Sequence, residues 1–408
     1  MSLPPPRRAA LVLCTREGVV MGRLPAVPVA TPWWSDIEPV GDAAREVFGL
    51  EVVVLRMLDT ELPRPDGGLV TYLAEVEGLS PEARAQLEPW EPAGGALDDQ
   101  PLRHAYAKPG GPAADLAWAE RVLRERRIER IGPARQVRSW NLSSIWRLPT
   151  AGGAAWLKVV PPFFAHEGDV LRRLQGGPVP RLLGHDGARI LMADIPGEDQ
   201  YNAPFPSLLV MVSRLVELQA AWIGREEELF AMRLPDWRPA ALSALIARLV
   251  ERRGDELEPG ERATLTAFVE ELPERFSAIG ECGLPVTFVH GDFHPGNVRG
   301  SGSDELTLLD WGDTGVGNPL LDTPAFFAAI PAGDAGAVRK HWLGAWRTRV
   351  PGADPERAAA LLEPIAAARQ AVIYQQFLDH IEPVERRHHD ADVTDWLRRA
   401  ARILLDTF

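Results

Sequence analysis

The chain has 408 residues, more than one hydrophobic core usually serves, so we expect two or three domains. Its 46% hydrophobic and 25% charged residues are typical of a globular protein. A net charge of −13 argues against a nucleic-acid partner, because phosphate backbones demand basic surfaces. No run reaches the roughly 18 apolar residues of a membrane span. Two distant cysteines make neither a disulfide framework nor a zinc site, so we expect a cytoplasmic protein, and nothing identifies a protein partner.

Residues 1–108 are predicted to form a small β-rich or α/β domain. The pattern of apolar residues predicts strands at Ala9–Leu13, Glu51–Leu55 and Leu69–Val76, and a short helix at Asp42–Phe48. A stretch rich in Pro and Gly, from Glu88 to Gly111, is typical of a linker. Residues 109–130 complete this linker with an amphipathic helix, which we expect at Ala113–Arg127.

Residues 131–200 have a different pattern, in the order strand, tight turn, strand, strand, helix, strand. The expected elements are strands Gln136–Trp140, Ser144–Leu148, Trp156–Val160 and Ile190–Ile195, and a helix at Ala165–Leu174. Residues 201–408 are predicted to be mostly helical. Helices are expected after an N-cap at Ser207, at Ala240–Val250 and at Arg262–Phe276, with two short strands at Pro285–Val289 and Leu306–Leu309.

Polar side chains follow each of the two short strands. The segment HGDFHPGN, residues 290–297, comes after the first strand, and LLDWGD, residues 308–313, contains the end of the second. Phosphoryl transfer needs a carboxylate to take the proton of the attacking hydroxyl, oxygen ligands for magnesium and a cation for the phosphates. Asp292 and Asn297 lie five residues apart on one loop, and Asp310 brings a further oxygen ligand from the neighbouring loop.

The first segment resembles the catalytic loop of the aminoglycoside phosphotransferase and choline kinase group, H-G-D followed by four residues and Asn. It is also similar to the protein-kinase H-R-D-L-x-x-x-N loop, and LLDWGD resembles the group's metal-binding segment. The resemblance covers residues 130–408 and implies an α+β, two-lobed, protein-kinase-like fold, with a small β-rich lobe at 131–200 and a helical lobe at 201–408. It also implies a role for each matching residue: Asp292 as catalytic base, Asn297 and Asp310 as Mg²⁺ ligands, His290 as a structural residue, and Asp322 in NPLLD as the brace of the loop. Asp313 fits either support of these residues or a solvated loop equally well.

The group requires a lysine on the third strand of the small lobe and a glutamate on the next helix. Lysine occurs only at positions 108, 158 and 340, and Lys158 lies on the expected strand. Glu167 is the expected glutamate, and Asp169 on the same helix is the alternative. ATP is therefore the implied nucleotide, with backbone groups from Ala193 to Ile195 meeting the adenine.

The expected nucleotide loop, RSWNLSS at residues 138–144, contains no glycine. Protein kinases use glycines there to let backbone N–H groups approach the phosphates. We therefore expect donors from side chains or from less closely placed backbone N–H groups: Ser139 and Ser143, with Asn141 and Ser144 as further candidates.

A small-molecule hydroxyl acceptor is implied, and its site is expected in the helical lobe. The stretch YQQFLDHIEPVE offers Tyr374, Asp379, Glu382 and Glu385 for an amine-bearing acceptor, although a solvated helix face is the favoured interpretation of these residues. His388 and His389 are interpreted as surface residues, because adjacent helical side chains point to different faces.

The sequence AAREVFGLEV and the strands after it resemble a Nudix domain, so residues 1–108 are predicted to be a degenerate Nudix-like accessory domain. Nudix hydrolysis needs several glutamates on one helix, and here Glu46 stands alone before Val47 and Phe48, so no pyrophosphatase activity is expected. The prediction is an ATP- and Mg²⁺-dependent phosphotransferase acting on an aminoglycoside, amino-sugar, sugar or amino-alcohol. The alternative is a nucleotide-binding, pseudokinase-like regulatory module.

Overall fold

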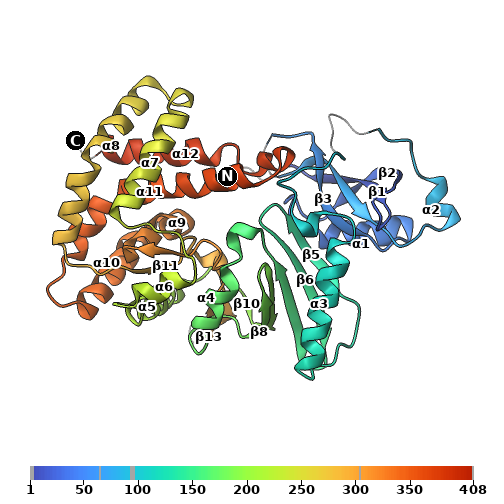
Figure 1. The fold of residues 1–408 in the computed structure, drawn as a ribbon, viewed down its shortest axis with the longest axis horizontal. Coiled ribbons are helices and arrows are strands. Elements are labelled where there is room, and N and C mark those ends of the chain that lie inside the picture. Colours follow the sequence, from blue (N-terminus) through green and yellow to red (C-terminus); the bar gives the residue numbers. More distant parts are fainter. Residues whose placement is uncertain (1–3, 64–65, 92–96, 303–304, 407–408) are drawn as a thin grey trace. The chain divides into compact units, whose positions relative to one another are not determined.

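The fold was analysed in a computed structural model, which describes residues 4–63, 66–91, 97–302 and 305–406 (Figure 1). The chain forms two compact units. The first comprises residues up to 165 together with 182–194 and 377–390, and the second comprises 166–181, 195–376 and 391 onward. Each unit is thus assembled from segments that lie far apart in the sequence.

A four-stranded mixed sheet forms the N-terminal part of the first unit, in the order β2-β1-β4-β3. Its strands are β1 (Arg7–Cys14), β2 (Val20–Val29), β3 (Val53–Thr60) and β4 (Gly68–Glu75). Helix α1 (Glu38–Phe48) packs Val40, Ala44 and Phe48 into the same core as Leu11 and Tyr72. Gly49, with φ of 65°, ends this helix in the left-handed conformation that glycine adopts without strain. A short helix, α2 (Pro81–Ala85), follows.

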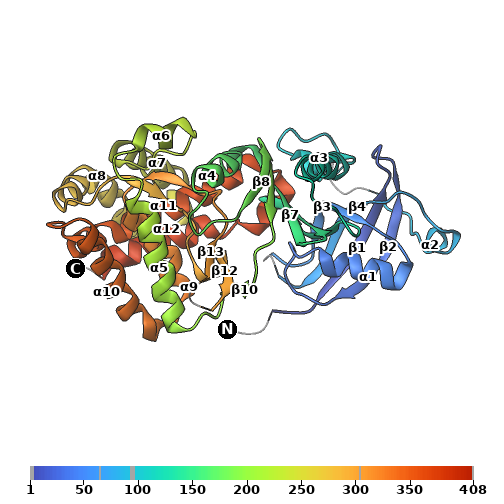
Figure 2. The ribbon, with the colours of Figure 1, turned by 90° about the horizontal axis from the view of Figure 1, so that it is seen from below.

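A five-stranded antiparallel sheet, in the order β5-β6-β7-β9-β8, forms the rest of this unit's scaffold. Its strands are β5 (Arg135–Trp140), β6 (Ser143–Thr150), β7 (Gly153–Val159), β8 (Leu182–Asp186) and β9 (Arg189–Ala193). Helix α3 (Gly111–Glu125) lies beside this sheet (Figure 2). It places Trp118, Ala119 and Leu123 in one core with the apolar residues of these strands. The expected strands at 136–140, 144–148, 156–160 and 190–195 correspond to β5, β6, β7 and β9, whereas β8 was not expected.

The two sheets of the first unit are joined through β3 and β5. The side-chain amide of Gln136 donates to the carbonyl of Val54 and accepts from its N–H, both at 2.8 Å. The Ile37 N–H also donates to the carbonyl of Val137 at 3.0 Å. The N-terminal sheet is therefore bonded directly to the strand that precedes the expected nucleotide loop.

The second unit is mostly helical (Figure 1). Its helices are α4 (Glu167–Arg173), α5 (Phe205–Ala220), α6 (Glu226–Ala231), α7 (Pro239–Arg253), α8 (Pro259–Glu281), α9 (Thr323–Ala329), α10 (Ala332–Arg349), α11 (Pro355–His380) and α12 (Asp392–Leu405). The last four residues of α11 belong to the first unit. One sheet has the order β10-β12-β13, formed by Glu198–Asp199, Val298–Ser301 and Glu305–Leu308, and another pairs β11 (Thr287–Val289) with β14 (Gly315–Gly317).

Some local expectations were wrong. Ser207 is not an N-cap, because α5 begins at Phe205 after Pro204, and Ser207 lies buried in its first turn. His388 and His389 are not surface residues, since their side chains pack against Trp140 and both are buried. The elements that were not expected include strands β2, β8, β10, β12 and β14 and helices α2 and α6. Among the residues that the structure describes, no helix combines the length and apolar character needed to cross a membrane.

Candidate active site

The segment HGDFHPGN leaves the buried strand β11 and forms a loop in the second unit. Phe293 anchors this loop, because its fully buried ring stacks on Phe326 with centroids 5.1 Å apart. Gly291 has φ of 96°, and a Cβ on it would lie 2.0 Å from the carbonyl oxygen of Asp313. Only glycine therefore fits at this point, where the two polar segments touch.

Asp292 and Asn297 are in direct contact. The side-chain nitrogen of Asn297 donates to the carboxylate Oδ2 of Asp292 at 2.9 Å and to its backbone carbonyl at 2.8 Å. On the other side, Nε2 of His294 lies 3.5 Å from the same Oδ2. Because Nδ1 of His294 accepts from the Gly296 N–H, the proton of a neutral imidazole is on Nε2 and faces Asp292. The Asp292 side chain remains 40% exposed, so its carboxylate is both held and accessible.

The electrostatics of the loop favour a charged Asp292. Desolvation by burial acts to raise the pKa of Asp292, but the hydrogen bond and charge of His294 and the hydrogen bond of Asn297 outweigh it and lower the pKa below its ordinary value. His290 is fully buried, and burial lowers its pKa to about 4, so it is neutral near pH 7. It is therefore a structural group of the loop in this environment.

Asp310 follows β13, and the residue before it, Leu309, is hydrogen-bonded to the HGDFHPGN loop. The Leu309 N–H donates to the Asn297 carbonyl at 2.8 Å, and Nε2 of His290 lies 2.9 Å from the Leu309 carbonyl. Asp310 itself is exposed and has φ of 60°, a left-handed conformation that few residues other than Gly, Asn and Asp adopt readily. Its charge helps to raise the pKa of His294.

Asp322 holds the base of the loop. Its buried carboxylate accepts from the backbone N–H groups of His290 at 2.9 Å and Gly291 at 2.8 Å, and from the side chain of Gln219 at 2.9 Å. Burial raises the pKa of Asp322 to about 6, against the opposing charge of Arg369. Arg369, also fully buried, donates to the Gly291 carbonyl at 2.8 Å.

The expected acidic residue of helix α4 also lies in the second unit. Glu167 is 2% exposed, and its Oε1 accepts from the Trp311 N–H at 3.3 Å, next to Asp310. The alternative, Asp169, forms a surface ion pair with Arg172 on the same helix. Position 167 is therefore the one directed at the LLDWGD segment.

The remaining expected nucleotide residues lie mainly in the first unit. Lys158 is 8% exposed on β7, opposite Ile145 of β6 and Ile190 of β9. Ala193 ends β9 and is buried. Ile195 belongs to the second unit, and its carbonyl accepts from Nε of Arg299 at 2.9 Å.

The side chains of the expected nucleotide loop are engaged elsewhere. Ser139 donates to the carbonyl of Leu55 at 3.4 Å, and Ser143 accepts from the indole of Trp140 at 3.1 Å. Ser144 accepts from Trp146, and all of these serines are at most 5% exposed. The hydroxyls of Ser139 and Ser143 thus bond within the first unit, and a contact of this turn with phosphates through its backbone stays a prediction.

The expected substrate residues are not gathered in one unit. Tyr374 lies in the second unit, where burial raises its pKa well above the ordinary value, and Asp379 and Glu382 lie in the first. Glu382 is 6% exposed, and its carboxylate is bound by Arg103 at 2.9 Å. This buried ion pair corrects the assignment of Glu382 to an amine-bearing acceptor.

Sequence reasoning missed Gln219, His294 and Arg369. A signal existed for two of them, since each is a polar residue within an apolar helical run, LVELQAAW and IAAARQAVI. A buried polar side chain needs a partner, so such residues are candidates for contacts with loops. The sequence does not say which loop each one reaches.

Comparison with known proteins agrees with this geometry. The model of a family described as "Phosphotransferase enzyme family" matches residues 134–361, more than half of the chain. The crystal structure of macrolide 2'-phosphotransferase MphH from Brachybacterium faecium is 17% identical, with 68% of this chain and 97% of that chain covered and a TM-score of 0.50. A macrolide 2'-phosphotransferase type I is 14% identical, with 69% of this chain and 97% of that chain covered and a TM-score of 0.51.

A choline/ethanolamine kinase family protein from Mesorhizobium loti is 16% identical, with 67% of this chain and 92% of that chain covered and a TM-score of 0.47. No curated protein matches the chain. At these identities the likeness of the two macrolide phosphotransferases shows the fold, and the expected two-lobed, protein-kinase-like fold is confirmed. The family match begins at residue 134, so the Nudix-like interpretation of residues 1–108 stays a prediction.

Proposed function

Because the chain belongs to the phosphotransferase enzyme family, whose members are small-molecule kinases, we propose that it transfers the γ-phosphoryl group of ATP to a hydroxyl of a small molecule. Mg²⁺ is the proposed cofactor, and the proposed acceptors are aminoglycosides, amino-sugars, sugars and amino-alcohols. The observation that carries the proposal is the contact of Asn297 with Asp292, which fixes an accessible carboxylate beside an amide oxygen suited to a metal.

Asp292 is the proposed general base. Its lowered pKa keeps it ionised near neutral pH, so it can accept the proton of the acceptor hydroxyl as that oxygen attacks the γ-phosphorus. One O–P bond forms to the acceptor, the bond between the β–γ bridging oxygen and the γ-phosphorus breaks, and ADP leaves with the electron pair. Asn297 and His294 hold the carboxylate in place during this step.

Asn297 and Asp310 are the proposed magnesium ligands, and their chemistry fits this metal. Asn297 uses its side-chain nitrogen toward Asp292, which leaves Oδ1 as the ligand atom, and Asp310 contributes an exposed carboxylate. The described residues contain no cluster of three or more His, Cys, Asp or Glu side chains able to hold a metal. Magnesium in such enzymes takes one or two protein carboxylates or amides and completes its shell with phosphates and water. When bound, it neutralises charge on the transferring phosphoryl group.

Lys158 and Glu167 are the proposed nucleotide-binding residues, supported by their burial and by their places on β7 and α4. Lys158 supplies the cation for the phosphates. Glu167 also supports the metal-binding segment through the Trp311 N–H. Backbone groups from Ala193 to Ile195 remain the proposed contact for the adenine.

The test is a transfer assay with γ-labelled ATP and Mg²⁺ across aminoglycosides, macrolides, choline and simple sugars. We expect one class to be phosphorylated, and Asp292→Asn to lower kcat by roughly 10²–10⁴ because the general base is lost. Asp395→Asn is the matched control, since Asp395 is 66% exposed on α12. Tight binding of Mg·ATP without transfer to any acceptor would refute the proposal and favour the regulatory module.

A further inference from the structure

The turn between β5 and β6 is held by residues distant in the sequence. Asn141, at its tip, is 3% exposed. Its side-chain nitrogen donates to the Glu385 carbonyl at 3.0 Å, and its Oδ1 lies 3.1 Å from Nε2 of His389. Both ends of the amide are therefore engaged by the segment 382–389, which follows α11.

The other residues of the turn are fixed as well. The Trp140 ring packs against His388 and His389, each with centroids 5.6 Å away, and the Trp140 carbonyl accepts from the Tyr106 hydroxyl at 3.0 Å. The Ser139 N–H donates to the Ser35 carbonyl at 3.2 Å. Contacts thus reach the turn from the N-terminal domain and from the segment 382–389 together.

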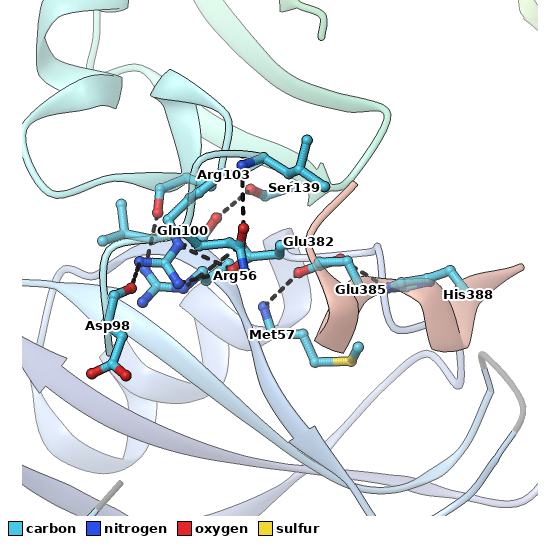
Figure 3. A network of polar contacts seen from close by, with 12 residues as sticks. Arg56, Met57, Asp98, Gln100, Arg103, Ser139, Glu382, Glu385 and His388 are labelled. Carbon is cyan, nitrogen blue, oxygen red and sulfur yellow. Dashed lines mark hydrogen bonds and ion pairs between the residues drawn. The ribbon is translucent and has the colours of Figure 1, made fainter. Parts of the chain in front are cut away.

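The segment 382–389 is in turn fixed to strand β3 of the N-terminal domain (Figure 3). Glu385 Oε1 accepts from the Met57 N–H at 3.1 Å. In addition, Nη1 of Arg387 donates to the carbonyl and hydroxyl of Thr60, both at 2.9 Å. We name β3 and the segment 382–389 together the brace.

Buried charges make the brace hard to open. Arg103 donates to both carboxylate oxygens of Glu382, at 3.3 and 3.1 Å from Nε, and Arg56 lies 3.9 Å from the same carboxylate (Figure 3). Arg56 and Glu382 are 3% and 6% exposed. Moving the segment away from β3 would leave these charges buried without compensation, which proteins tolerate poorly.

We propose that the brace holds the β5–β6 turn in a fixed, nucleotide-ready conformation, and that Asn141 is the positioning residue through which it acts. This inference rests on the proposed use of ATP. Glycine-rich loops become ordered as they cover a nucleotide. The turn here has no glycine and is already ordered by its contacts in the absence of nucleotide. Nucleotide binding therefore does not lose free energy to ordering the turn, and each residue that is ordered beforehand improves the affinity roughly tenfold.

The experiment compares wild type with Asn141→Ala in the full chain. Affinity for the non-hydrolysable analogue AMPPNP with Mg²⁺ is measured by calorimetry, and kinetics are measured with ATP. We expect the Kd for AMPPNP and the KM for ATP to rise about tenfold, while kcat changes less than twofold. Arg387→Ala, at a side chain that is 42% exposed, should raise the same Kd about threefold, because only part of the brace is released.

Hydrogen exchange of the peptide 137–145 gives a readout that general destabilisation does not imitate. In wild type we expect slow exchange with or without AMPPNP. In Asn141→Ala we expect at least tenfold faster exchange, with slow exchange restored by AMPPNP. Leu24→Ala is the control: it creates a cavity in the N-terminal core at the far strand of the sheet, β2, and should leave the Kd unchanged.

The outcomes separate the two proposals. A wild type that binds AMPPNP but phosphorylates no acceptor contradicts only the proposed transfer, and the comparison of Kd values still decides the role of the brace. A Kd in Asn141→Ala within twofold of wild type overturns the brace, as does an equal effect of Leu24→Ala. A wild type that binds no nucleotide overturns both.

Discussion

Replacing Asp322 by alanine tests how much of the catalytic loop depends on one buried carboxylate. Asp322 is fully buried and accepts from two backbone N–H groups of the loop, at His290 and Gly291, and from Gln219. The substitution leaves these donors without a partner and removes the negative charge that stabilises buried Arg369 most. Asp322→Asn is the milder change, because it keeps one acceptor oxygen in the same space.

The expected loss follows from these contacts. Each buried donor left unsatisfied costs about 1–3 kcal/mol, and an uncompensated buried charge costs about 3–5 kcal/mol. The donors and Arg369 lie around the same carboxylate, so water that enters the cavity can hydrogen-bond to several of them at once. The individual energetic costs therefore do not add. We expect Asp322→Ala to lower the free energy of unfolding by about 4–5 kcal/mol and Asp322→Asn by about 2 kcal/mol.

Urea unfolding followed by tryptophan fluorescence and circular dichroism measures this change as a shift in midpoint at constant slope. Asp395→Ala, at an exposed position, should change stability by less than about 0.5 kcal/mol. In the double variant Asp322→Ala, Arg369→Met, the loss should be smaller than the sum of the single losses, because the two charges are removed together. A loss below about 1 kcal/mol for Asp322→Ala would refute the reasoning that this carboxylate supports the loop.

Further predictions concern the loop and its metal. Gly291→Ala should abolish transfer and destabilise the fold, because the added Cβ would meet the Asp313 carbonyl at 2.0 Å; a variant with native circular dichroism and full activity would contradict this. The pKa of His290 is lowered by burial to about 4, against 6.5 in an unfolded chain, so between these values the unfolded state binds more protons. The free energy of unfolding should therefore fall by up to about 3 kcal/mol as the pH drops from 6.5 to 4. In His290→Gln the free energy of unfolding should depend less on pH over this range. Asp310→Asn should keep the left-handed backbone and the melting temperature, yet raise the Mg²⁺ concentration needed for half-maximal transfer; an unchanged Mg²⁺ titration would remove Asp310 from the metal site.

Much of the fold could be predicted because its signals are local. The strands at 136–140 and 190–193 and the helices at 239–253 and 259–281 have apolar residues at the periods of their structures. Asp292 and Asn297 could be predicted to lie close together for the same reason, because they are only five residues apart on one loop. Strand β2 was missed because Pro25 and Pro28 interrupt its pattern.

The sequence by itself determined the HGDFHPGN and LLDWGD segments, the strands that precede them and the residue types available for the proposed phosphoryl transfer. Only the tertiary structure decided that the serines of the β5–β6 turn face inward, that Glu382 binds Arg103 and that Arg369 reaches Gly291. The period of the apolar residues along the chain indicates which side chains are buried, because residues at that spacing lie on the same face of a helix or strand. It does not tell which distant group a buried charge will meet, since that depends on how elements hundreds of residues apart pack together.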